Sequence, residues 1–262
     1  MSTLHSVDFL YVLSGFCVGA LVGMTGVGGG SLMTPVLILL FGVHPSTAVG
    51  TDLLYAATTK TGGTAVHSLH RTIDWRIVGR LASGSIPAAA LTILVLSRFD
   101  VGSEGVRTVI NEVLGAALLL TALVLIFRRW ILEVYAARVG RLDARTTRRL
   151  TISFGAVLGV LVSISSVGAG AIGVTALLLL YPDLPMRRIV GSDIAHAVPL
   201  TLVGGLGHWM LGTINWPILV SLLVGSLPGV LLGGHVSIKV PDMVLRISLA
   251  TILVVVGGRL VM

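Results

Sequence analysis

Residues 23–35 read GMTGVGGGSLMTP and lie between two strongly apolar runs. Five of the eight residues from Gly23 to Gly30 are glycine. In hydrocarbon every backbone N–H and C=O must be paired, so irregular glycine-rich backbone is tolerated only where protein or a water-filled cavity surrounds it. If the chain spans a membrane, the stretch therefore predicts either a binding site or a tight helix crossing.

The composition predicts an integral membrane protein. Of the 262 residues, 55% are hydrophobic and only 11% are charged, and the mean hydropathy is +1.00. A spanning helix needs about 20 residues, so there is room for roughly eight to ten spans and no separate soluble domain. The net charge of +7 falls in short loops, which argues against a nucleic-acid partner. Cys17 is the only cysteine, which excludes disulfides and thiolate metal sites.

Ten apolar segments are separated by glycine, proline or charged residues. The second and seventh have about twelve residues each, too few to cross the hydrocarbon, and each follows a glycine cluster. We expect these two to be half-helices. The segments cover residues 8–25, 31–42, 46–69, 76–97, 106–127, 149–166, 170–181, 188–211, 216–237 and 243–262.

The chain repeats itself at an offset of 140 to 141 residues, which indicates two homologous halves of about five segments each. An odd number of segments in each half predicts that the halves have opposite orientations in the membrane. The fold class is therefore an all-α polytopic membrane protein with two inverted-topology repeats. The matches are VGGG (27–30) with VGAG (167–170), VGTD (49–52) with VGSD (190–193), TIDW (72–75) with TINW (213–216), and GSIP (84–87) with GSLP (225–228).

The basic residues predict the topology, because short cytoplasmic loops carry an excess of Lys and Arg. With alternating segments, fourteen Lys and Arg residues fall on one side and three, Arg98, Arg107 and Arg259, on the other. We therefore expect a multi-pass membrane protein with both termini outside. Residues 1–127 form the first repeat, 128–148 a cytoplasmic basic loop and 149–262 the second repeat. Whether the first two segments each span or form a re-entrant pair stays open.

The two glycine clusters are candidate binding sites for a small anion. In inverted-repeat transporters, broken helices direct half-helix N-termini, with free N–H groups and partial positive charge, at an anionic substrate near the midplane. The alternative is that the glycines only permit close helix packing. The candidate substrate-binding residues here are Gly28, Gly29, Gly30, Ser31, Gly168, Ala169 and Gly170.

Ionisable residues inside the third and eighth segments are functional candidates, because they are costly in a membrane. Lys60 lies mid-segment and can hold the charge of an anion or pair with Asp52. Asp52, Asp193 and His196 are candidates for carrying coupled protons. The alternative for the aspartates is a first-turn position that complements the helix dipole. The hydroxyls of Thr51 and Ser192, each beside an aspartate, complete the predicted substrate-binding set.

Two histidines and two tryptophans near the segment ends have simpler interpretations than substrate binding. His67 and His208 lie beside TIDW and TINW, where interfacial hydrogen bonding is the simpler role. Trp75 and Trp216 fit the aromatic belt at the membrane surface.

At these motifs the sequence resembles the TauE/SafE family of sulfite exporters, also known as anion permeases with the DUF81 domain. The residues that carry the resemblance are GVGGG (26–30), Pro35, AVGTD (48–52), RTIDW (71–75), VGAG, IVGSD and GTINW. It implies an inner-membrane carrier that moves sulfite, thiosulfate, organosulfonates or related small anions, often outward. The chain departs from the family pattern at Asp52 and Asp193, where neutral Ser or Asn is more usual, and in VGAG.

The leading hypothesis is a secondary transporter, expected to be an exporter, of small sulfur-containing anions such as sulfite, thiosulfate or organosulfonates. It works by alternating access, with protons as candidate coupling ions. A second hypothesis is a divalent-cation transporter that uses Asp52, Asp193 and His196. A third hypothesis is a membrane-embedded enzyme, but no interfacial loop contains a cluster of Asp, Glu, His or Ser with a spacing suited to catalysis. The predicted partners are the anion and the lipid bilayer, with no cofactor, no bound metal and no nucleic acid, and a homodimer is left open.

Overall fold

The computed structural model describes residues 8–25, 30–138, 142–168, 170–237 and 242–261. All regular structure in these ranges is α-helical, which confirms the predicted all-α class. The helices are α1 (Phe9–Thr25), α2 (Gly30–Leu39), α3 (Pro45–Leu69), α4 (Trp75–Leu96), α5 (Glu104–Arg138), α6 (Ala144–Ser165), α7 (Ala171–Leu180), α8 (Met186–Met210), α9 (Trp216–Ser237) and α10 (Asp242–Val261).

One helix is longer than the hydropathy pattern predicts. The apolar segment expected to end at residue 127 continues as α5 to Arg138. Residues 128–138 contain no Gly or Pro, and most of them favour helix. The basic segment 128–148 therefore includes the end of α5 and the first turn of α6.

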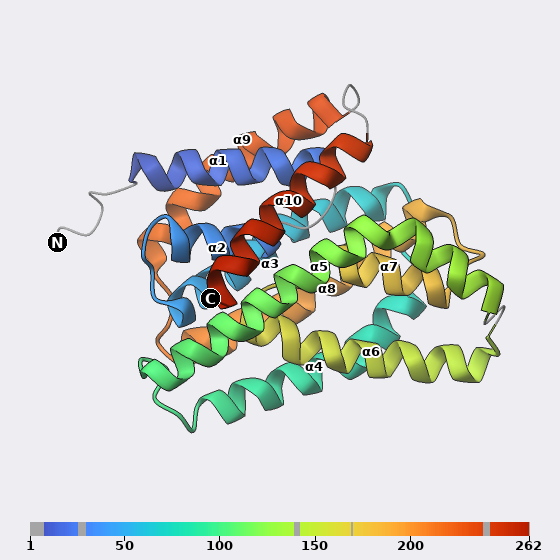
Figure 1. Cartoon of the computed structure of the whole chain (residues 1–262), viewed down its shortest axis with the longest axis horizontal. Coiled ribbons are helices and arrows are strands. Elements are labelled where there is room, and N and C mark those ends of the chain that lie inside the picture. The colour runs from blue at the N-terminus through green and yellow to red at the C-terminus, as the bar shows by residue number, and fades with distance from the viewer. Residues whose placement is uncertain (1–7, 26–29, 139–141, 169, 238–241, 262) are drawn as a thin grey trace.

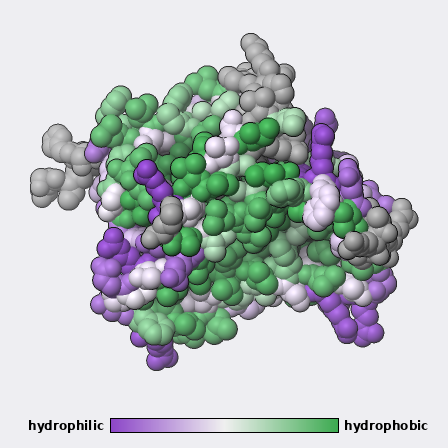
Figure 2. All heavy atoms as spheres, viewed as in Figure 1, coloured by the Kyte–Doolittle hydropathy of each residue, from purple (hydrophilic) through white to green (hydrophobic). Residues whose placement is uncertain are grey.

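The chain is a multi-pass membrane protein. Five of the described helices, namely α4, α5, α6, α8 and α9, contain a stretch long and apolar enough to cross a membrane. Figure 2 shows hydrophobic side chains across the middle of the visible face and hydrophilic ones gathered toward its two ends. This distribution matches a bilayer whose hydrocarbon surrounds the middle of the helices.

The two short helices occur where the glycine clusters predict them. Both α2 and α7 have 10 residues. Before α7 the backbone takes positive φ at Ser166 (59°), Gly168 (125°) and Gly170 (138°), and glycine adopts such angles without the steric cost of a Cβ. This is the physical reason for a glycine cluster between α6 and α7. Residues 26–29, which precede α2, lie outside the described part of the chain.

Two helix pairs at opposite edges of the molecule are packed through glycine. Figure 1 shows α1 beside α9 along one edge and α4 beside α6 along the other. A Cβ on Gly225 would collide with the backbone of α1 at Val12, and a Cβ on Gly155 would collide with the backbone of α4 at Leu81. Gly84, one repeat offset before Gly225, makes the same kind of approach to α6. In both pairs, a helix from one half of the sequence packs against a helix from the other half.

The two long helices α3 and α8 pack against each other between these edges. Gly50, near the start of α3, lies against His208 near the end of α8, and Gly191, near the start of α8, lies against His67 near the end of α3. The two helices are therefore antiparallel. Gly63 lies beside Ile194, and its counterpart Gly204 lies beside Leu53. These reciprocal contacts follow the sequence repeat, whereas the opposite orientation of the two halves in a bilayer stays a prediction.

Candidate functional site

The middle of α3 and α8 holds a group of buried ionisable side chains. Asp52, Lys60, Asp193 and His196 are each at most 7% exposed. Asp52 is the eighth residue of α3 and Asp193 the eighth of α8, and neither helix has an acidic residue in its first turn. Dipole complementation acts within the first turn of a helix, so it does not account for these carboxylates.

Asp52 connects α3 to the half-helix α2. The backbone N–H of Thr34 donates to Asp52 Oδ2 at 3.2 Å, and the Thr34 hydroxyl donates to the same oxygen. The other oxygen, Oδ1, is buried and has no hydrogen-bond partner among the described residues. The Ser166 side chain, at the end of α6, also interacts with this carboxylate. Asp52 thus brings α2, α3 and the end of α6 together.

Asp193 makes the corresponding contact with the other half-helix. A Cβ on Gly173 would collide with Asp193 Oδ1, so the carboxylate lies directly against the backbone of α7. Within the described chain Oδ1 has no hydrogen-bond partner. Asp193 is therefore less fixed by hydrogen bonds than Asp52.

Lys60 lies close enough to both carboxylates to interact with them electrostatically. Among the described residues, no carboxylate oxygen lies within 4.0 Å of the Lys60 ammonium group. Lys60 is also the one buried Lys or Arg in the described chain. A buried cation without a close partner is costly, which makes Lys60 the strongest candidate for binding an anion.

His196 lies on the same side of α8 as this group. Its Nε2 is 2.8 Å from Ser85 Oγ on α4, and its Nδ1 is buried without a partner in the described residues. His196 also interacts electrostatically with Lys60. Asp52, Asp193 and His196 do not form a metal-binding group, because no cluster of three or more His, Cys, Asp or Glu occurs among the described residues. The geometry therefore does not favour the divalent-cation hypothesis.

Thr51 and Ser192 connect the two halves of the sequence. Thr51 Oγ1 accepts the backbone N–H of Asn215 at 3.1 Å, and Ser192 Oγ accepts the backbone N–H of Asp74 at 2.9 Å. Ser192 also donates to the carbonyl of Arg188. Each hydroxyl thus holds the N–H that precedes a helix of the opposite half. The structure gives both a clear role in packing, and their role in substrate binding stays a prediction.

The glycine residues predicted to bind the anion are only partly described. Gly30 begins α2, and Gly168 and Gly170 are buried in the turn before α7. Gly28, Gly29 and Ala169 lie outside the described residues, as does the side chain of Ser31. The described parts of α2 and α7 nevertheless meet the two aspartates, through Thr34 and Gly173.

The structure adds three polar residues that the sequence analysis did not select: Thr34, Ser85 and Ser166. Thr34 is the last polar residue of a short apolar segment, and Ser85 belongs to the repeated GSIP motif. Both residues could therefore have been selected as candidates from the sequence. Ser166 did not, because its importance depends on the left-handed turn at the end of α6.

His67 and His208 make hydrogen bonds near the ends of their helices, and their place at the membrane interface stays a prediction. His67 Nδ1 is 2.8 Å from Thr72 Oγ1, and His208 Nδ1 is 3.0 Å from Thr213 Oγ1. His208 Nε2 is also 3.0 Å from the carbonyl of Ser163. These contacts close the turns after α3 and α8.

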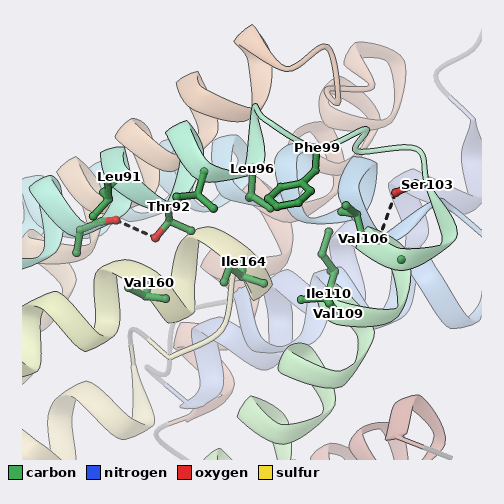
Figure 3. A pocket seen from close by; sticks show the side chains of 13 residues that line it. Leu91, Thr92, Leu96, Phe99, Ser103, Val106, Val109, Ile110, Val160 and Ile164 are labelled. Atoms are coloured by element: carbon green, nitrogen blue, oxygen red, sulfur yellow. Dashed lines mark hydrogen bonds between the residues drawn. The ribbon is translucent and has the colours of Figure 1, made fainter.

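A cavity of about 700 Å³ lies away from this polar group, among α4, α5 and α6 (Figure 3). Its lining is almost entirely hydrocarbon, including Leu91, Phe99 and Val109. Thr92 and Ser103 also line the cavity, but their hydroxyls donate to backbone carbonyls. Because it offers no charge or free donor to an anion, this cavity is not the substrate site.

Comparison with known proteins places the chain in a family. The family described as "Sulfite exporter TauE/SafE" matches residues 11–260. The "Probable membrane transporter protein YjnA" of Bacillus subtilis is 39% identical over 251 residues, covering 95% of this chain and 98% of that protein. YdhB of B. subtilis is 28% identical, covering 90% and 93%, and MJ0441 of Methanocaldococcus jannaschii is 25% identical, covering 95% and 93%; both are also described as probable membrane transporter proteins. No solved structure matches the chain. The chain, with its glycine-opened half-helices and buried polar centre, belongs to the TauE/SafE family of membrane transporters.

Proposed function

We propose that this chain is a secondary transporter of small sulfur-containing anions, such as sulfite, thiosulfate or an organosulfonate, and that Lys60 binds the anion. The observation that carries the proposal is a buried lysine that has no close ion-pair partner among the described residues, set among two carboxylates that each have one oxygen without a hydrogen-bond partner there. The half-helices α2 and α7 reach the same centre through Thr34 and Gly173. Their N-terminal N–H groups supply further donors for the oxygens of the anion.

The charges of this centre favour coupling to protons. With both aspartates ionised, the centre made of Lys60, Asp52 and Asp193 has a net charge of −1 and repels an anion. Protonating both carboxylates leaves the charge of Lys60 alone, and an anion then neutralises it. Because an uncompensated charge is costly in a low-dielectric interior, the anion and the protons bind together. The transporter therefore acts as an anion–proton symporter, and alternating access exposes the centre to each side in turn.

Flux of radiolabelled sulfite in proteoliposomes tests this function. Lys60→Met removes the charge, and we expect flux to fall by at least about tenfold, whereas Lys60→Arg retains part of it. Thr201→Val, at the repeat-equivalent position of α8, is the matched control and keeps near-normal flux. Normal flux in Lys60→Met would overturn the assignment of the anion to Lys60.

A pH-sensitive dye inside the same vesicles tests the coupling. We expect sulfite entry to acidify the lumen in the wild type, and Asp193→Asn to transport sulfite with less proton movement. Sulfite flux with unchanged proton movement in both Asp52→Asn and Asp193→Asn would show that these carboxylates do not carry the coupled protons.

A further inference from the structure

A polar pocket lies away from the buried centre, at the face that holds most of the arginines. It has a volume of about 260 Å³ and is formed by the beginning of α4, the beginning of α6 and the turn between α7 and α8. The residues at this pocket, which we call the arginine-face pocket, are Arg80, Leu142, Ala144, Thr147, Leu180, Tyr181, Pro182, Asp183 and Leu184.

A chain of hydrogen bonds fixes the guanidinium of Arg80 in this pocket. Thr151 Oγ1 donates to the carbonyl of Thr147, so its single proton is already used. Tyr181 must then donate to Thr151 across their 2.8 Å contact, and its oxygen is left to accept from Arg80 Nη1 at 3.1 Å. Arginine has five N–H donors, of which this bond uses one. The remaining donors are held in a defined orientation and suit the oxygens of a small anion.

Thr147 provides a second donor in the same pocket. It is 8% exposed, and its hydroxyl makes no hydrogen bond with other described residues. Asp183 also lines the pocket, but it is exposed and takes part in an interaction of its own. Water screens the charge of an exposed carboxylate, so Asp183 opposes anion binding less than a buried carboxylate does.

The repeat-equivalent place in the other half of the sequence is chemically different. Ser221 stands where the first half has Arg80, and its hydroxyl donates to the carbonyl of Pro217. Tyr11 and Phe41 stand where the second half has Thr151 and Tyr181, and their rings stack at 4.3 Å. The cationic arrangement therefore occurs in one of the two equivalent places, and that place is on the face where the arginines predict the cytoplasm.

We propose that the arginine-face pocket binds one small oxyanion and collects the substrate from the arginine-rich side before it reaches Lys60. The proposal rests on the proposed function for the identity of the anion. Exposed arginines elsewhere on the same face, including Arg145 and Arg187, raise the local concentration of anions there. Because the equivalent place in the other half lacks the arginine, the pocket favours loading of the anion from the arginine-rich side.

Equilibrium binding of radiolabelled sulfite to the full-length protein tests the pocket without requiring transport. The protein is held in phosphatidylcholine nanodiscs, and all variants carry Lys60→Met so that the central site does not contribute. We expect this background to bind sulfite and Arg80→Gln to weaken the binding by about tenfold or more, because a charge-assisted hydrogen bond is lost. Thr147→Val weakens it less. Arg76→Gln, one helical turn away on α4 and outside the pocket, changes binding less than twofold.

Equal binding by the Arg80→Gln and Arg76→Gln variants would overturn the proposal. Nanodiscs with phosphatidylglycerol test whether a lipid phosphate fills the pocket instead, and complete loss of sulfite binding there would also overturn it. A wild type that moves no sulfite would refute the proposed function, whereas the binding measurement would still decide on the pocket.

Discussion

The two buried aspartates are held in different ways, which suits them to different proposed roles. Asp52 accepts two hydrogen bonds from Thr34 through one oxygen, whereas Asp193 lies directly against the backbone of Gly173. Asp52 is therefore suited to hold α2 in place. Asp193 has fewer hydrogen bonds to lose, so it is better suited to exchange a proton during transport.

Thr34→Val tests the role of Asp52 in holding α2. The variant leaves a buried carboxylate with one hydrogen bond fewer, and we expect the free energy of unfolding to fall by about 1–3 kcal/mol. Thr175→Val in α7 is the matched control, because the Thr175 hydroxyl donates to Ala171 within its own helix. Denaturant unfolding in detergent measures both, and equal losses would contradict the proposed difference.

At the scale of helices, the hydroxyls of Thr51 and Ser192 hold the N-terminal turns of α9 and α4. Ser192→Ala leaves the partly buried backbone N–H of Asp74 without its acceptor, and Thr51→Val does the same to Asn215. We expect each change to lower the free energy of unfolding by about 1–3 kcal/mol.

Thermal unfolding with and without sulfite separates this packing role from anion binding. If the hydroxyls act only in packing, sulfite stabilises the variants as much as the wild type. Loss of that stabilisation in either variant would place its hydroxyl at the anion.

The glycine contact between α4 and α6 predicts a sharp difference between two glycines. Gly155→Ala places a Cβ against the backbone of α4, and we expect a loss of about 1–3 kcal/mol from overpacking. Gly79 lies within α4 with no atom near its Cβ position, so Gly79→Ala raises stability by up to about 1 kcal/mol through helix propensity. Unfolding in detergent measures both changes. A neutral Gly155→Ala would mean that the pair can separate without cost.

Most helices could be predicted from the sequence because lipid exposure imposes a strong hydropathy signal. The two short helices were also predictable, since glycine clusters interrupt the apolar runs. The continuation of α5 to Arg138 was not, because charged residues are compatible with a helix that extends beyond the bilayer. The partners of Asp52 and His196 were not predictable either, since Thr34 and Ser85 come from other helices and only packing brings them close.

At the scale of the whole molecule, the two halves of the sequence are interlocked. The pairs α1 with α9, α4 with α6, α3 with α8 and α5 with α10 each join helices from different halves. A movement of one intact half against the other would break all four contacts at once. We therefore expect the units that move in the proposed alternating access to be groups of paired helices, such as α1 with α9 against α4 with α6.

Splitting the chain between α5 and α6 tests this interlocking. We expect each piece expressed alone to be degraded or to aggregate, because its glycine faces have no partner. The two pieces expressed together associate and recover part of the sulfite flux. Co-purification and flux measure the outcome, and a piece that is stable and monodisperse alone would contradict the interlocking.

The glycine contacts also bear on how such a chain arose. Each half has the surface that its counterpart needs, so two copies of one short gene product, inserted in opposite directions, would fit together in the same way. Joining the copies end to end keeps that pairing and lets each copy change separately. Arginine at position 80 and serine at position 221 are one outcome of that freedom, and they give an otherwise reversible carrier a preferred entrance.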